Sequence, residues 1–294
     1  AAACLLVPLP EVFRGLESYY LVAYGVVLLG VMVALPGGID GLIRSVLPDR
    51  SDTLPDPLPL QFGTETLFAE QLGKSFGGNR ALVDLSLRLE PGSITGMIGP
   101  NGSGKTTALN LISGIAAADT GQVRLGDRDL SALSPVQRAR AGLARGFQHP
   151  AFPKDLTVLQ AVSAGATSGR GRTALDLVGL TSLHDLSVAT LGGGDMRLLD
   201  LARALATEPS VLLLDEPAAG LSAAERARLS EILKKLRRER LAILVVEHRM
   251  DFLMAVSDKV VCLVGGESVA SGTPAEVRVD PRVRAAYLGR EAAT

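Results

Sequence analysis

The chain has 294 residues, of which 47% are hydrophobic and 21% charged, and its formal net charge is −1. A chain this apolar can bury a core, which excludes a disordered protein, and its near-neutral charge gives no basic footprint for nucleic acid. The two cysteines, Cys4 and Cys262, lie far apart without metal or redox spacing, which excludes a disulfide scaffold and favours free thiols.

The first element along the chain is an uncharged apolar run, Tyr19–Leu35. As a helix it would be about 26 Å long, close to the ~30 Å hydrocarbon core of a bilayer. Charged residues precede the run and a basic N-terminal region is missing, so a cleaved signal peptide fits badly. We expect a transmembrane helix here; the alternative is a helix buried in the core of the protein.

A proline-rich stretch at residues 49–64 follows the apolar run. Its first part, residues 49–61, carries three prolines and three aspartates. This composition is typical of an extended linker and of a domain boundary. We therefore expect three parts: a tail with one apolar helix at 1–48, a linker at 49–64 and a folded domain at 65–294.

From about residue 65, short apolar runs alternate with helical stretches, which is the pattern of an α/β domain. Leu82–Leu89 alternates apolar and polar residues, and this predicts a half-buried antiparallel strand. Central parallel strands are predicted at four short apolar runs: Ser93–Ile98, Val211–Leu214, Ala242–Val246 and Lys259–Val264.

A glycine-rich loop at residues 99–106 reads Gly-Pro-Asn-Gly-Ser-Gly-Lys-Thr and matches the P-loop pattern between a strand and a helix. Its glycines let backbone N–H groups approach phosphate oxygens, and the helix N-terminus adds a positive dipole. Lys105 is expected to reach the β- and γ-phosphates, and the Thr106 hydroxyl to bind Mg²⁺. The predicted phosphate-binding residues are Gly99, Pro100, Asn101, Gly102, Ser103, Gly104, Lys105, Thr106 and Thr107.

Two adjacent carboxylates follow the predicted strand Val211–Leu214. Asp215 stands at the end of that strand, where it can hold Mg²⁺ through water. Glu216 follows it and can polarise the water that attacks the γ-phosphate. Together with the glycine-rich loop, this pair predicts phosphoryl transfer to water.

The ordered set of motifs over residues 67–290 resembles the ABC-type ATPases. The resemblance implies a RecA-like core with an antiparallel β subdomain, a short helical subdomain at about 149–205, and ATP and Mg²⁺ as cofactors. It also implies that Phe76 stacks on adenine, that Gln148 meets both Mg²⁺ and a transmembrane partner, and that His248 contacts the γ-phosphate. The implied catalytic residues are Glu216, His248 and Lys105, and the implied metal ligands are Thr106, Gln148 and Asp215.

Four stretches, at residues 76–78, 142–145, 218–221 and 246–251, resemble the ATP-binding subunits of branched-chain amino-acid importers. Residues 1–48 are similar to the last helix and tail of the matching permease. The resemblance implies permease subunits, a second identical or paralogous ATPase subunit and, indirectly, an external solute-binding protein as partners, with no nucleic acid. It places the protein at the cytoplasmic face of the inner membrane, where it would import an amino acid.

The chain departs from the family in the signature loop, residues 191–195. The loop is commonly Leu-Ser-Gly-Gly-Gln in the family and is Leu-Gly-Gly-Gly-Asp here, so the serine hydroxyl is missing. Gly192, Gly193 and Gly194 are still expected to bind the nucleotide of a partner subunit. The departure leaves an alternative function open: a regulatory or non-transport ABC-type ATPase with weak hydrolysis.

Overall fold

A computed structural model describes residues 54–148 and 150–288. The chain divides into two compact units between Thr53 and Leu54, and the predicted tail and helix at Tyr19–Leu35 lie outside the described residues. Within residues 54–148 and 150–288, no helix is both long and apolar enough to cross a membrane. The transmembrane helix therefore stays a prediction.

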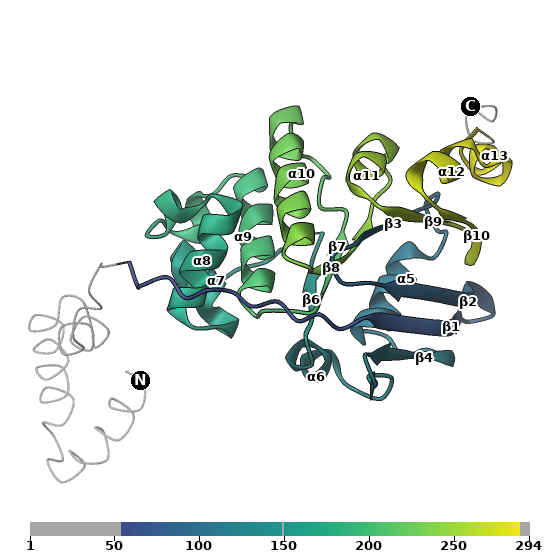
Figure 1. The fold of residues 1–294 in the computed structure, drawn as a ribbon, viewed down its shortest axis with the longest axis horizontal. Helices are drawn as coiled ribbons and strands as arrows, with labels where there is room; N and C mark the ends of the chain where they lie inside the picture. Colours follow the sequence, from purple (N-terminus) through teal and green to yellow (C-terminus); the bar gives the residue numbers. More distant parts are fainter. Residues whose placement is uncertain (1–53, 149, 289–294) are drawn as a thin grey trace, which may run out of the picture. The chain divides into compact units, whose positions relative to one another are not determined.

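The centre of the second unit is a six-stranded, mainly parallel sheet with the order β10-β9-β3-β8-β7-β6 (Figure 1). Every residue of β3, β7 and β8 is buried, which explains why these strands appear in the sequence as short continuous apolar runs. The four predicted parallel strands are confirmed as β3, β7, β8 and β9. The strands are β3 (Ile94–Ile98), β6 (Leu143–Gly146), β7 (Val211–Asp215), β8 (Ala242–Val246), β9 (Lys259–Val264) and the antiparallel edge strand β10 (Glu267–Gly272).

A second, four-stranded antiparallel sheet has the order β2-β1-β4-β5. The alternation at Leu82–Leu89 is confirmed, because this segment is part of β2 and its leucines are buried, while Val83 is half-buried. Helix α5 packs against both sheets, and their facing side chains share one core. The elements are β1 (Leu67–Phe76), β2 (Asn79–Leu89), β4 (Thr120–Leu125), β5 (Arg128–Asp129) and α5 (Lys105–Ser113).

The other face of the central sheet is covered by α9, α10 and α11 (Figure 1). Successive residues of β7 alternate between the two cores: Leu212 and Leu214 face these helices, while Val211 and Leu213 face α5. Helix α10 begins with a capping box between Ser222 and Glu225. The helices on this face are α9 (Gly193–Leu205), α10 (Ala223–Arg238) and α11 (Met250–Val256), and the chain also forms α6 (Pro135–Arg140), α12 (Pro274–Val279) and α13 (Pro281–Leu288).

A small helical group, α7 (Val158–Val162), α8 (Ser168–Val178) and α9, lies between β6 and β7 in the sequence. Residues 54–63, the end of the proline-rich stretch, form no helix or strand; residues 55–58 lie against α8 and Gln61 contacts Glu208. The Leu58 N–H donates to the Gly169 carbonyl at 3.2 Å, and the Arg172 Nη1 donates to the Pro55 carbonyl at 2.7 Å. The contacts of the second unit therefore extend to residue 54, although its first strand begins at Leu67.

Candidate nucleotide and catalytic site

The glycine-rich loop joins β3 to α5, so its backbone turns at the carboxyl end of a central parallel strand. Gly99 has φ 155°, and a Cβ there would lie 2.2 Å from the Leu263 carbonyl oxygen. Gly104 has φ 100°, and a Cβ there would lie 2.5 Å from the Ala81 carbonyl oxygen. Only glycine fits these two positions without displacing backbone, so the loop lies directly on its neighbours and leads into the N-terminus of α5.

A polar cavity of about 340 Å³ opens on this loop. The Lys105 ammonium donates to the carbonyls of Gly99 at 2.7 Å and Pro100 at 3.0 Å, which places it at the base of the loop. The Ser103 hydroxyl is buried and forms no hydrogen bond with any residue that the structure describes. A buried hydroxyl beside a lysine and a helix N-terminus suits phosphate oxygens. The cavity is lined by Asn79, Arg80, Ala81, Gly102, Ser103, Gly104, Lys105, Thr106, Thr107 and Gly265.

Asp215 ends β7, and its side chain is about one-tenth exposed. The Arg145 Nη2 lies 3.0 Å from Asp215 Oδ2 and pairs with it. Burial raises the pKa of Asp215, and the positive charge of Arg145 opposes this rise. A carboxylate, together with the Thr106 hydroxyl and the Gln148 amide oxygen, is a donor set that suits a hard cation such as Mg²⁺.

Three residues predicted from separate motifs lie together beyond the ends of three neighbouring strands. The Gln148 Nε2 donates to Glu216 Oε2 at 2.6 Å, and the His248 Nδ1 lies 3.8 Å from Glu216 Oε1. Glu216 has a left-handed backbone with φ 47°, an uncommon conformation that recurs at functional sites. The geometry brings these side chains together as expected, and their separate roles stay predictions.

The predicted adenine residue, Phe76, ends β1 and is 54% exposed. The Lys74 Nζ lies 5.6 Å from the centre of its ring. A second cavity, of about 400 Å³, is lined by Lys74 and Arg80. The open ring of Phe76 is thus available for stacking, and Arg80 lines both the cavity beside Lys74 and the cavity at the glycine-rich loop.

Gly192, Gly193 and Gly194 form the start of α9. A Cβ at Gly192 or Gly193 would meet no atom within 4 Å, whereas one at Gly194 would lie 1.9 Å from Glu225 Oε1. Gly192 and Gly193 are therefore accessible at the N-terminus of α9. Gly194 has no side chain, and this leaves room for Glu225 of the capping box of α10. Their predicted contact with the nucleotide of a partner subunit stays a prediction.

Three residues contact the site that the sequence reasoning did not single out as functional. The Arg145 guanidinium reaches Asp215, and the Arg197 Nη1 donates to the Glu216 carbonyl at 3.2 Å. Glu247 is fully buried, and its Oε1 accepts a 2.7 Å hydrogen bond from the Ala218 N–H, just beyond Glu216. For two of them the sequence offers a hint in their position: Arg145 lies three residues before Gln148, and Glu247 directly precedes His248.

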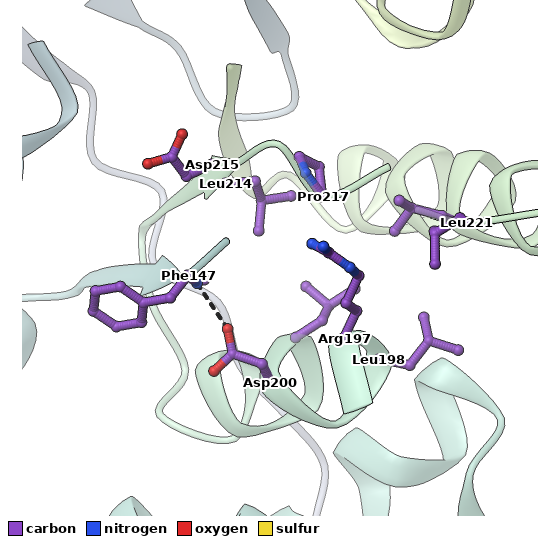
Figure 2. A pocket seen from close by; sticks show the side chains of 11 residues that line it. Phe147, Arg197, Leu198, Asp200, Leu214, Asp215, Pro217 and Leu221 are labelled. Carbon is purple, nitrogen blue, oxygen red and sulfur yellow. Dashed lines mark hydrogen bonds between the residues drawn. The ribbon is translucent and has the colours of Figure 1, made fainter. Parts of the chain in front are cut away.

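A cavity of about 30 Å³ lies beside Asp215, between the start of α9 and the turn after β7 (Figure 2). Its labelled lining is mostly apolar, and Asp200 Oδ2 accepts a 2.8 Å hydrogen bond from the Phe147 N–H at its edge. The cavity is far too small for a nucleotide, because ligand pockets have volumes of roughly 300 Å³ or more. The site of the expected chemistry is therefore the cavity at the glycine-rich loop.

Residues 82–219 match the family model described as "ABC transporter", and residues 269–293 match the one described as "Branched-chain amino acid ATP-binding cassette transporter". A similar solved structure is the ADP conformation of MJ1267, an ATP-binding cassette of an ABC transporter. It is 29% identical, with a TM-score of 0.72, and the match covers 77% of this chain and all of that chain.

Two groups of curated relatives are also similar. The high-affinity branched-chain amino acid transport ATP-binding protein LivG of Escherichia coli (strain K12) is 36% identical over 239 residues, covering 73% of this chain and 94% of LivG. LivG of Salmonella typhimurium has the same identity and coverage. The lipopolysaccharide export system ATP-binding protein LptB of Escherichia coli (strain K12) is 34% identical over 236 residues, covering 77% of this chain and 98% of LptB.

Proposed function

Because this chain belongs to the ABC transporter family of ATP-binding proteins, we propose that it powers the import of branched-chain amino acids through a membrane permease. The chain is an ABC-type ATPase. LivG and LptB have similar identities to it, so overall identity alone does not favour one cargo. The observation that carries the proposal is the match of residues 269–293 to the branched-chain amino-acid transporter model.

The proposed chemistry is ATP hydrolysis by residues at the ends of β3, β6, β7 and β8. Lys105 and the hydroxyl of Ser103 would hold phosphate oxygens, and Mg²⁺ would neutralise charge on the phosphates. Its ligands would come from Thr106, Gln148 and Asp215. Glu216 is proposed to orient and polarise the attacking water, and His248 to contact the γ-phosphate.

A groove beside Gln148 supports the proposed docking of a permease. It is about 160 Å³, and two of its lining side chains, Ile115 and Phe147, are exposed apolar groups. Phe147 directly precedes Gln148, whose amide reaches Glu216. A permease segment in this groove would therefore contact the backbone that carries Gln148 into the site.

The remaining parts of the proposal follow from the family. A second ATPase subunit would present its signature loop to the nucleotide held here, and an external solute-binding protein would deliver the amino acid to the permease. The working location is the cytoplasmic face of the inner membrane, where ATP is available. The alternative, a regulatory or non-transport ATPase with weak hydrolysis, is favoured by one observation only: the glycine at position 192 in place of serine.

Reconstitution in proteoliposomes tests the proposal. The purified chain would be combined with branched-chain amino-acid permease subunits and their binding protein, and ATP hydrolysis and uptake of labelled leucine would be measured. We expect ATP-dependent leucine uptake and a several-fold stimulation of hydrolysis by the permease, both abolished by Glu216→Gln. Hydrolysis that no permease changes, without uptake, would favour the regulatory alternative.

A further inference from the structure

We infer that Arg145 is a positioning residue: it holds Asp215 and Thr106 in relative positions from which both can bind one cation. The inference rests on the proposed function only through its assignment of Thr106 and Asp215 as Mg²⁺ ligands. Arg145 belongs to β6, and its side chain is about one-tenth exposed. A buried guanidinium needs several acceptors, and those acceptors define its role.

The guanidinium of Arg145 joins two different elements. Its Nη2 donates to Asp215 Oδ2 on β7 at 3.0 Å. Its Nη1 donates to Asn110 Oδ1 at 2.8 Å and to Ser113 Oγ at 2.9 Å, both on α5. Because the guanidinium is planar and rigid, fixing one of its edges on α5 also fixes where the other edge holds the carboxylate.

The bond to α5 matters because of where that helix begins. Thr106 lies in its first turn, and Asn110 lies four residues later on the same side. Arg145 therefore connects the face of α5 that carries the Thr106 hydroxyl to the Asp215 carboxylate. It occupies one oxygen of Asp215 and leaves the other oxygen for a further ligand.

A lysine at position 145 would keep the positive charge but could not reproduce this geometry. Its single ammonium nitrogen cannot hold α5 and Asp215 at two separate edges. Arg145→Lys thus removes the connection while preserving the charge next to Asp215. Asn110→Ala tests the same connection from the other side, because it removes one anchor and leaves the bond to Asp215.

A matched control is available in Arg138, another buried arginine bound to the same helix. Its Nη1 donates to the carbonyls of Leu111 and Ile112, each at 2.7 Å, and its side chain is directed to the end of α5. It forms none of its described hydrogen bonds with Asp215. Arg138→Lys therefore loosens α5 by a comparable change without touching the proposed cation site.

The experiment measures binding of a fluorescent ATP analogue to the full-length chain, in EDTA and in Mg²⁺, along with thermal unfolding. The quantity of interest is the factor by which Mg²⁺ raises affinity, because a general loss of stability cancels in this ratio. We expect Arg145→Lys to lower this factor roughly tenfold, as loss of a charge-assisted bond would, with affinity in EDTA unchanged within about twofold. Asn110→Ala should lower it about threefold, and Arg138→Lys should lower only the unfolding temperature.

Two outcomes would contradict the inference in different ways. If Mg²⁺ raises the affinity of the wild type and of Arg145→Lys by the same factor, Arg145 is only a structural residue and the proposed site stands. If Mg²⁺ does not raise the affinity of the wild type at all, the assigned ligands are wrong and the inference fails together with them.

Discussion

The side chains of Gln148 and Glu216 form a 2.6 Å hydrogen bond that joins the segment after β6 to the end of β7. The amide nitrogen of Gln148 is the donor, so its oxygen is left for another partner. Gln148 thus contacts the Glu216 carboxylate directly, while its neighbour Phe147 lines the exposed groove. A displacement of this segment would move the amide away from Glu216, so the proposed docking of a permease would have a physical route to the proposed site of hydrolysis.

We expect Glu216→Gln to leave ATP affinity within about twofold and to lower hydrolysis by several orders of magnitude. The amide has nearly the shape of the carboxylate but polarises water poorly and cannot take its proton. Single-turnover hydrolysis and equilibrium nucleotide binding, measured on the same preparation, test this.

Lys105→Ala is the matched comparison for Glu216→Gln. It removes the buried ammonium at the base of the glycine-rich loop, so it should weaken ATP binding itself by roughly a hundredfold. Hydrolysis near the wild-type rate in Glu216→Gln would contradict the role of Glu216. Unchanged affinity in Lys105→Ala would contradict the role of that lysine.

Restoring the family's serine with Gly192→Ser should strengthen ATP-dependent dimerisation at least about tenfold, since a hydrogen bond to a charged group contributes roughly 1.5–3 kcal/mol and about 1.4 kcal/mol corresponds to a factor of ten. The position accepts a side chain, because a Cβ at Gly192 meets no atom within 4 Å. Analytical ultracentrifugation with ATP, in a Glu216→Gln background that preserves the nucleotide, measures the effect.

Gly194→Ser is the control for that substitution. A Cβ there would lie 1.9 Å from Glu225 Oε1, so the change should disturb the capping box of α10 and weaken dimers instead. If Gly192→Ser leaves dimerisation unchanged, the backbone N–H groups at the start of α9 already bind the phosphate sufficiently. The glycine would then not weaken the dimer.

The sequence predicted the strands well where they depend on a local pattern, and it singled out Lys105 and Glu216 from local motifs, although their roles stay predictions. The strands β7, β8 and β9 are short, largely buried runs with sharp ends. Glu216 directly follows β7, and Lys105 stands at the end of the glycine-rich loop that follows β3. Arg145 could not be placed in the same way, because its partners Asn110 and Asp215 are 35 and 70 residues distant along the chain. Their proximity depends on the order of strands in the sheet, which apolar periodicity does not encode.

The pH dependence of stability should reveal the buried carboxyl of Glu247. Burial raises the pKa of Glu247 above its ordinary value of 4.5, so the folded state holds this proton more tightly than the unfolded state. The group therefore costs stability progressively as pH rises above about 4.5, until it ionises in the folded state too. Glu247→Gln keeps an acceptor for the Ala218 N–H and should unfold less readily than the wild type at pH 8, with a smaller difference at pH 4.5.

Glu225→Gln should unfold more readily than the wild type at neutral pH, and this difference in stability should shrink as the pH falls. The hydroxyl of Ser222 and the backbone N–H beside it hold the pKa of Glu225 below its ordinary value, so its contribution is present at neutral pH and is lost as pH falls. Thermal unfolding followed by circular dichroism from pH 3 to 8 compares the two variants with the wild type, because the contribution of Glu225 is lost below its ordinary pKa of 4.5. Parallel curves for Glu247→Gln and the wild type would show that Glu247 is not the source of the pH dependence.

The last prediction concerns where the ATP-binding unit begins. We expect removal of residues 1–53 to leave ATP affinity unchanged, because every predicted nucleotide residue lies at or beyond Phe76 and the compact unit begins at Leu54. Removal of residues 1–63 should instead lower the free energy of unfolding by about 2 kcal/mol. That truncation strips Leu60 and Phe62, which pack against the core beside the helices, and together they account for that magnitude when half-buried.

A comparison of the two truncations isolates the contribution of residues 54–63, which contact α8 and Glu208. The longer truncation also removes the Gln61 N–H that donates to Glu208 Oε1 at 2.9 Å, and it exposes the Arg172 guanidinium that held the Pro55 carbonyl. Urea unfolding and nucleotide binding of both truncated products test whether residues 54–63 belong to the folded unit. Equal stability would mean that residues 54–63 are only a linker, as their proline-rich composition suggests; an aggregating product of the shorter truncation would mean that Tyr19–Leu35 belongs to the core. A stable shorter truncation with a weakened longer one would place the boundary at Leu54, because the contacts to α8 and Glu208 are the difference between the two.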